Sequence, residues 1–269
     1  CGRGLYIYSA ATNIQVTGNV FQQCTNGVYL DAKVDLFSEN DIRACLGYGL
    51  QLQNNNADVK ILNNVFLKNS GAGILMDSAS TNAVIRNNTL VANTQGILLT
   101  NTDGLTIRNN IIAYSVNSGI TADVNSIGFW NPGFNCYYSN GVDYAGSAFP
   151  GANDIALDPK FASMVIGNED LHLRSRSGRI APNGWVYDPD HSPCIDAGDA
   201  SPFGLEPVPN GGRINIGRYG NTVEASRSLI PLVVETAFGA TMPPQGTNWL
   251  GFGSPVVCEV LNSPAPDGA

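Results

Sequence analysis

The chain has 269 residues, with 22 acidic and 14 basic side chains and a formal net charge of −8. Charged residues make up 13%, about half the share in an ordinary soluble domain, while Asn and Gly contribute 30 residues each. The negative charge argues against a nucleic-acid partner, which requires a basic face. No apolar run approaches the roughly 20 residues of a membrane span. The sequence opens without an initiator Met or a signal peptide, so we expect a mature or excised piece of a longer protein.

Two landmarks recur in phase through the first half of the chain. One is an Asn followed by two further residues of a short strand, at Asn19, Asn40, Asn64, Asn88 and Asn110. The other is a Gly followed by an aliphatic residue, at Gly4, Gly27, Gly49, Gly73, Gly96 and Gly119. A repeat of about 23 residues with two or three strands is too short for a propeller blade. The repeat predicts an all-β solenoid, a parallel β-helix whose coils stack about 4.8 Å apart.

Residues alternate after each Gly, and a period of two assigns them to two faces of a strand. The columns beginning at Leu5 and Ile7 are predicted to face the core. The columns beginning at Tyr6 and Tyr8 are predicted to face outward. We expect each Asn to occupy a turn, where it adopts a left-handed conformation and bonds to the next coil.

Three cysteines fall in one column of successive coils, namely Cys1, Cys24 and Cys45. Later coils place Asn69, Asn93 and Ser115 in that column. A disulfide is one interpretation, because the coil spacing lies within the permitted Cα separation. We favour reduced, buried thiols, because side chains in a ladder run parallel and rarely reach the required dihedral angle.

Four short motifs follow the regular coils. They are D-P-x-F, L-H-L, S-P-C-I-D-A-G-D and N-I-G-x-Y-G, at Asp158–Phe161, Leu171–Leu173, Ser192–Asp199 and Asn215–Gly220. In this order they resemble the closing segment of secreted bacterial right-handed parallel β-helix proteins. The departures are Arg218, where Ala is usual, and an insertion at 177–191.

The resemblance covers residues 1–228 and implies a right-handed parallel β-helix of about 23 residues per coil. We expect regular coils to about residue 150 and an irregular C-terminal closing segment at 151–228. That segment is predicted to cover the open hydrophobic end of the solenoid. Residues 229–269 are predicted to be a β-rich extension or the truncated start of a following module. Its expected strands are 232–234 and 256–260.

Catalysis requires acids or bases in register, and the sequence offers few. Asp31 and Asp77 share one outward column two coils apart, about 9.6 Å by coil stacking. That separation lies at the edge of the range for an inverting hydrolase, but isolated Asp residues also solvate a face. A lyase needs a base. His172, between Leu171 and Leu173, is expected to be structural. Arg86 and Arg108 stack in one column, where they could grip an acidic sugar or form a solvated edge.

Binding of a sugar requires only aromatic faces with amide or carboxylate partners. The outward face offers a tyrosine cluster followed by amides and carboxylates, made of Tyr6, Tyr8, Tyr29, Asp31, Gln51, Gln53 and Asp77. The insertion adds Trp185 and Tyr187, which either bind ligand or pack on the core. For Trp130, a further aromatic candidate, we expect packing in the core.

β-Helix proteins of this family are commonly lyases, hydrolases or sugar-binding modules. The chain resembles the β-helical xylan-binding modules attached to bacterial xylanases. The resemblance implies a secreted, extracellular, non-catalytic module that binds plant cell-wall polysaccharide, with xylan or a related hemicellulose as partner and a linked catalytic module. The alternatives are a lyase or hydrolase using Asp31 and Asp77, and a structural adhesin or spacer. We expect no cofactor, nucleic acid or membrane; calcium near Asp188, Asp190, Asp196 and Asp199 stays open.

Overall fold

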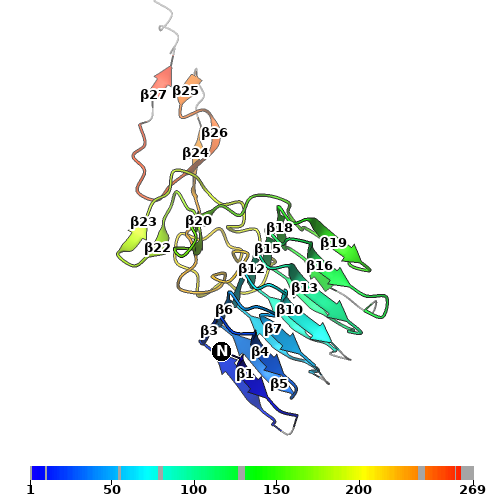
Figure 1. The fold of residues 1–269 in the computed structure, drawn as a ribbon. Coiled ribbons are helices and arrows are strands. Elements are labelled where there is room, and N and C mark those ends of the chain that lie inside the picture. The colour runs from blue at the N-terminus through cyan, green and yellow to red at the C-terminus, as the bar shows by residue number, and fades with distance from the viewer. Residues whose placement is uncertain are drawn as a thin grey trace, which may run out of the picture.

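The fold is an all-β solenoid of about six turns, spaced about 23 residues apart, in which parallel strands stack coil upon coil (Figure 1). The computed structural model describes residues 2–9, 11–53, 56–77, 81–126, 131–235, 240–257 and 259–261. These described residues contain no helix of the length and apolarity that a membrane span requires. The predicted fold class is confirmed.

Each regular coil contributes one short strand to each of three parallel sheets. Sheet A contains β1 (Arg3–Ile7), β4 (Asn26–Leu30), β7 (Leu50–Leu52), β10 (Ala72–Asp77), β13 (Gln95–Thr100), β16 (Ser118–Ala122) and β19 (Val142–Gly146). Sheet B contains β2 (Ile14–Thr17), β5 (Val34–Ser38), β8 (Lys60–Leu62), β11 (Val84–Arg86), β14 (Thr106–Arg108) and β17 (Asn131–Gly133). Sheet C contains β3 (Val20–Gln22), β6 (Asp41–Arg43), β9 (Val65–Leu67), β12 (Thr89–Val91), β15 (Ile111–Ala113) and β18 (Cys136–Tyr138).

Antiparallel strand pairs follow the solenoid. They pair β20 (Phe161–Ser163) with β21 (Asp170–Leu173), β22 (Arg179–Ala181) with β23 (Gly184–Val186), β24 (Ile230–Val234) with β26 (Gly246–Leu250), and β25 (Ala240–Met242) with β27 (Glu259–Leu261).

The predicted register of sheet A is confirmed. Leu5 pairs with Val28, and that column continues through Leu50, Ile74, Ile97 and Ile120. From Val28 onward these side chains are fully buried, and they form the core together with the inward residues of sheets B and C. Tyr6 pairs with Tyr29 and then Gln51 on the outward face.

The Gly landmark marks a close contact between coils rather than a turn. Gly27 and Gly96 lie within β4 and β13, not between strands. A Cβ atom on either residue would lie 2.4 Å from the carbonyl oxygen of the next Gly in the column. Only Gly therefore allows the coils to stack at this position.

The Asn landmark forms a continuous ladder at the corner between sheets B and C. The Asn64 backbone N–H and its side-chain Nδ2 both donate to Oδ1 of Asn88, each at 2.9 Å. Asn88 donates in the same way to Asn110, and its Nδ2 also reaches the Ile61 carbonyl oxygen at 2.8 Å. These side chains are fully buried, so each amide satisfies backbone groups that would otherwise lack a partner.

The left-handed conformation predicted for the ladder Asn belongs instead to the residue before it. Glu39, Asn63, Asn87 and Asn109 have φ between 53° and 57°, whereas the ladder residues do not. Asn tolerates this region better than most residues do, which explains the Asn-Asn pairs. The sequence predicted that one Asn would adopt the left-handed conformation and also bond to the next coil. In the structure two consecutive residues perform these two roles.

The predicted cysteine column is confirmed for the described residues. The Cys45 backbone N–H donates to Oδ1 of Asn69 at 3.1 Å, and Asn69 donates to Asn93. Cys24 and Cys45 are buried and are not disulfide-bonded. Their environment is the one expected for reduced thiols that pack as small apolar groups. Cys1 lies outside the described residues.

The closing segment covers the solenoid end only with its first residues, and most of it packs elsewhere. Its first residues extend the coils, because Ala152 and Ile155 bridge to Gly133 and Cys136. The remainder lies along the flank of the solenoid, against the outer face of sheet C (Figure 1). There it covers Val65, Leu67, Val91, Ile111 and Ala113. The physical reason is that sheet C is apolar on its outer face and would otherwise expose that surface to water.

Polar contacts fasten this segment to the corner between sheets B and C. Asn63 and Asn87 donate to backbone carbonyl oxygens of the closing segment. Asp199 forms ion pairs with Arg86 and with Arg108, the latter at 3.1 Å. The stacked arginines therefore hold the closing segment and do not form a solvated edge. Arg218, the departure from the family pattern, donates to the Asn63 carbonyl oxygen at 2.7 Å.

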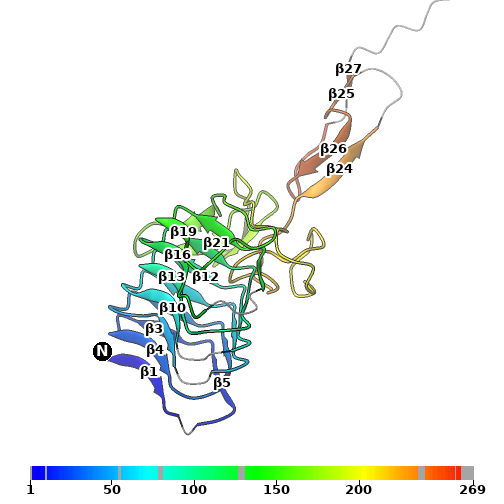
Figure 2. The same cartoon turned by 90° about the vertical axis from the view of Figure 1, so that its right-hand side faces the viewer.

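The C-terminal region forms two strand pairs that extend away from the closing segment (Figure 2). The strand expected at 232–234 is confirmed within β24, and the strand expected at 256–260 begins only at Glu259. The Pro- and Gly-rich stretch between the two expected strands contains β25 and β26. Cross-strand pairing overrides the low strand propensity of Gly and Pro there.

Candidate functional site

The outward face of sheet A brings together most of the predicted site residues. β1, β4, β7 and β10 lie side by side along one flank of the solenoid (Figure 1). They present Tyr6, Tyr29 and Gln51 in one column. Asp31, Gln53 and Asp77 belong to the second outward column, which Tyr8 begins. The closing segment lies on a different flank, against sheet C, so this face stays open.

Three tyrosine rings cluster at the first two coils. The Tyr6 ring centroid lies 4.1 Å from that of Tyr8 and 4.8 Å from that of Tyr29. The Arg3 guanidinium lies over the Tyr6 and Tyr29 rings, 4.4 Å from each centroid. Tyr8 is 67% exposed and Tyr6 and Tyr29 are partly exposed. The cluster offers aromatic surface of the kind that packs against the apolar side of a sugar ring.

A hydrogen-bonded row continues from the tyrosines into the next coils. The Tyr29 hydroxyl donates to Oε1 of Gln53, and Gln53 Nε2 donates to Oδ2 of Asp77 at 3.4 Å. Burial and the nearby Asp31 carboxylate raise the pKa of Tyr29, so the phenol remains a neutral donor. This row holds the amide and the carboxylate in place beside the aromatic surface.

Asp31 and Asp77 lie on either side of Gln53 in the second outward column. They are two coils apart with Gln53 between them, and Gln53 bonds to Asp77. Both side chains are partly exposed to solvent. Gln53 and Asp77 thus form part of a polar row on this face.

Trp185 and Tyr187 lie apart from this face. The predicted insertion forms the hairpin of β22 and β23 within the closing segment, away from sheet A (Figure 1). The Arg227 guanidinium lies 3.7 Å from the Trp185 ring centroid and covers one face of the indole. Tyr187 is 52% exposed. Both residues were predicted binding residues together with the tyrosines of sheet A, but the fold places them in a different part of the molecule. Trp130 lies outside the described residues.

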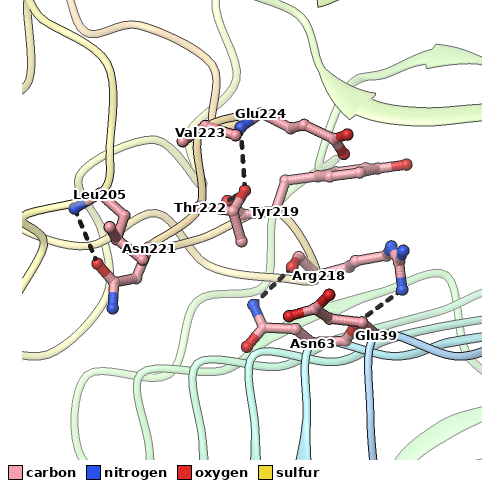
Figure 3. A pocket seen from close by; sticks show the side chains of 9 residues that line it. All are labelled: Glu39, Asn63, Leu205, Arg218, Tyr219, Asn221, Thr222, Val223 and Glu224. Atoms are coloured by element: carbon pink, nitrogen blue, oxygen red, sulfur yellow. Dashed lines mark hydrogen bonds between the residues drawn. The ribbon is translucent and has the colours of Figure 1, made fainter. Parts of the chain in front are cut away.

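A groove that the sequence did not predict lies between sheet C and the closing segment (Figure 3). Its cavity of about 450 Å³ is lined by Glu39 and Asn63 from the solenoid and by Arg218, Tyr219 and Glu224 from the closing segment. A second cavity of about 490 Å³ adjoins it and shares Tyr219 and Glu224. Figure 3 shows the Glu224 side chain alongside the Tyr219 ring.

His172 belongs to the second cavity. Its Nδ1 lies 2.6 Å from Oδ1 of Asp170, and its Nε2 lies 3.9 Å from Oε2 of Glu224. The imidazole stacks on Tyr219 with centroids 3.7 Å apart. Burial raises the pKa of Asp170, but bonds from His172 and the Arg179 charge outweigh it, so the net shift is downward. The contact between Asp170 and His172 could have been predicted from the sequence, because residues two apart on a strand share a face.

The groove is a weaker sugar site than sheet A. His172 stacks on Tyr219, and the Arg218 guanidinium lies 5.6 Å from its centroid, so this partly buried ring offers less open surface than Tyr8 does. Asp170 is already bound by His172 and by Arg179. Glu39 and Glu224, which also line the groove, could accept hydrogen bonds from sugar hydroxyl groups. They provide no aromatic surface on which a sugar ring could stack.

The aspartates considered for calcium do not converge. Asp188 pairs with Arg179, Asp190 faces Lys160 and Arg174, and Asp199 binds Arg86 and Arg108. Asp196 accepts a bond from the Ser228 hydroxyl at 2.8 Å. Among the residues that the structure describes, no three His, Cys, Asp or Glu side chains gather as a metal site. Calcium at these four positions thus has no support in their geometry.

Comparisons with known proteins agree with the fold. A family model described as a right handed beta helix region matches residues 1–112, the part of the chain that builds the first coils. Domains of this family often occur in proteins that act on polysaccharides. Searches of curated proteins and of solved structures each returned no significant match.

Proposed function

We propose that this right-handed β-helix repeat protein binds an extended plant cell-wall polysaccharide along the open face of sheet A, without catalysing its cleavage. The observation that carries the proposal is the adjacent Tyr6 and Tyr29 rings, 4.8 Å apart, which continue into the bonded row of Gln53 and Asp77. Aromatic rings beside fixed amides are the usual means of holding a neutral sugar.

The geometry favours an extended chain over a small sugar. The face is a flat, laddered surface rather than an enclosed cavity, and neighbouring strands repeat about every 4.8 Å. A polymer that runs along the solenoid axis would meet tyrosines on the first two coils and amides on the third. The net charge of −8 favours a neutral glycan over a polyuronate.

Xylan or a related hemicellulose is the proposed ligand, and its source is the family resemblance rather than the geometry. The same resemblance supports a secreted module that is covalently linked to a catalytic module. The sequence offers few acids and bases in register on this face, which supports binding over hydrolysis or lysis.

The proposal is tested by retention on insoluble xylan and on a panel of other glycans. We expect Tyr29→Ala to weaken retention about tenfold, because it removes stacking surface and the donor to Gln53. Tyr29→Phe keeps the ring and should weaken retention by about threefold or less. Tyr187→Ala is the matched control, because it removes an exposed tyrosine from the distant hairpin.

Two outcomes would overturn the proposal. Unchanged retention of Tyr6→Ala and Tyr29→Ala would exclude this face. Release of reducing ends or of unsaturated products by the wild-type chain would replace binding with catalysis, and Asp31→Asn and Asp77→Asn would then identify the groups involved. Failure to bind any glycan in the panel would favour a structural adhesin or spacer.

A further inference from the structure

An arginine lies on the tyrosine cluster of sheet A, where the proposed glycan would bind. The Arg3 guanidinium is 4.4 Å from the ring centroid of Tyr6 and 4.4 Å from that of Tyr29. The ring centroid of Tyr8 lies 4.1 Å from that of Tyr6, and Tyr8 is 67% exposed. A cation therefore lies close to the most exposed ring of the cluster.

The first two coils position this arginine. Arg3 begins β1 and pairs with Asn26 of β4 in parallel register. Its contact with two aromatic rings at once restricts a long side chain that has many rotamers in solution. Arg3 is nevertheless an exposed residue. The strand pairing and the rings thus preorganise the guanidinium at a place that a ligand can reach.

The guanidinium group recognises one kind of ligand better than others. Its N–H donors lie in one plane and form a fork that matches the two oxygens of a carboxylate. Hydrogen bonds between two charged groups are also stronger than those between a charged group and a neutral hydroxyl group. A carboxylate is therefore the sugar substituent that Arg3 would bind best.

The charges around Arg3 limit how many carboxylates the ligand can carry. In the strands of sheet A that the structure describes, Arg3 is the only Lys or Arg. Asp77 ends β10 and Asp31 directly follows β4, and both belong to the second outward column. A polyuronate along this face would bring carboxylates next to these aspartates, where like charges repel. The face therefore suits a neutral chain that carries isolated carboxylates.

We propose that Arg3 binds the carboxylate of an acidic side group on an otherwise neutral polysaccharide. The neutral backbone packs against Tyr8, and the side group reaches Arg3 across Tyr6. This inference rests on the proposed glycan binding and names its substrate class, a hemicellulose with uronic acid branches. Because the ion pair would be exposed, it adds selectivity among glycans more than it adds affinity.

The test uses the full chain and two forms of one polysaccharide. One form is a xylan with glucuronic acid branches, and the other is the same xylan after its carboxyl groups have been reduced to alcohols. Affinity electrophoresis measures binding of both. We expect the wild-type chain to bind the acidic form about three- to fivefold more tightly at low salt. This preference should shrink as salt is added, because exposed ion pairs are screened.

Three variants assign the preference to a residue. Arg3→Gln should bind the two forms equally. Arg3→Lys keeps the charge without the planar fork and should retain only part of the preference. Arg176→Gln is the matched control, because it removes an exposed arginine from the closing segment, and it should keep the whole preference.

The outcomes separate this inference from glycan binding itself. Equal binding of both forms by the wild-type chain would overturn the role of Arg3 and leave glycan binding intact. A preference that survives in Arg3→Gln would also overturn it, because another cation would then hold the carboxylate. Binding of neither form would refute glycan binding and the role of Arg3 together. If Arg3→Gln fails to fold, Arg3→Lys decides, and a full preference in that variant would contradict recognition by the fork.

Discussion

The outer faces of sheets A and C belong to the same coils but have opposite surroundings. On sheet A, the outward residues Tyr29, Gln51 and Leu98 remain partly exposed. On sheet C, the corresponding residues Leu67 and Val91 are almost completely buried under the closing segment. The inward columns of both sheets form one core. The outward columns therefore decide which face is covered and which is available to a ligand.

Several strands of sheet C and the sheet A strand β7 differ in how polar and apolar residues alternate. The sheet C strands Val65–Leu67, Thr89–Val91 and Ile111–Ala113 are apolar at nearly every position. A continuous apolar run is typical of a strand that is buried on both faces. The sheet A strand Leu50–Leu52 alternates instead, with Gln51 outward. The covering of sheet C cannot be inferred from this feature alone, because Ile97, Leu98 and Leu99 form an unbroken apolar run in a strand of the open sheet A.

The largest expected effect comes from placing a charge on each face. Val91→Asp would bury a carboxylate without a partner beneath the closing segment. We expect a loss of about 4 kcal/mol in the free energy of unfolding, or detachment of the segment. Leu98→Asp places the same group on the open face and should cost about 1 kcal/mol or less. Urea unfolding measures both, and equal losses would show that the two faces do not differ.

A smaller effect is expected at the Asn ladder on the corner between sheets B and C. Asn88→Ala removes the acceptor of the Asn64 N–H and the donor to the Ile61 carbonyl oxygen, both of which are buried. We expect a loss of about 2–4 kcal/mol, because unsatisfied buried groups are costly. Asn19→Ala, at the exposed start of the ladder, should lose about 1 kcal/mol or less. If urea unfolding gave the two variants the same stability, ladder position would not matter.

Periodicity was sufficient to predict the solenoid. Its coil length, inward columns and Cys24–Cys45 column all follow from residues that recur at one spacing, because stacking places like residues together. The docking of the closing segment did not follow, because it depends on contacts without a repeat. Asp199, for example, binds Arg86 more than one hundred positions earlier in the chain. No local pattern in the sequence marks that pair.

The candidate site on sheet A was predictable where it depends on the repeat, and not where it depends on the position of the closing segment. Alternation placed Tyr6, Tyr29 and Gln53 on one face, and register placed them side by side. The sequence could not separate Trp185 from them, since its position depends on where the closing segment lies. The groove around Tyr219 was missed for the same reason, because its two walls come from segments far apart in the chain.

The two regions should also differ in their response to pH, and this is the smallest effect that we predict. Asn ladders contain no titratable group, whereas carboxylates hold the closing segment together. Glu206 is buried, and its Oε1 accepts bonds from the backbone N–H groups of Asn215 and Asn221, both at 2.8 Å. Burial raises the pKa of Glu206 to about 7, with the nearby Asp196 charge adding to the effect.

A raised carboxyl pKa makes the folded state hold its proton more tightly than the unfolded state. The contribution of Glu206 to stability is therefore greatest at low pH, and it falls as the pH rises from about 4.5 to about 7. Glu206→Gln keeps the acceptor oxygen but cannot ionise. At pH 8 the variant should be more stable than wild type by about 2 kcal/mol, and at pH 4 the difference should nearly vanish.

Urea unfolding of both proteins at pH 4, 6 and 8 measures this difference, with Glu39→Gln as the matched control in an exposed turn of the solenoid. Subtracting the wild-type curve removes every other titrating group, so the remaining slope belongs to Glu206. A gain at pH 8 that is lost in acid would show that the closing segment is the pH-sensitive part. An equal gain at all three values would mean that Glu206 is not protonated more readily when folded, and the contrast between the regions would then rest on packing alone.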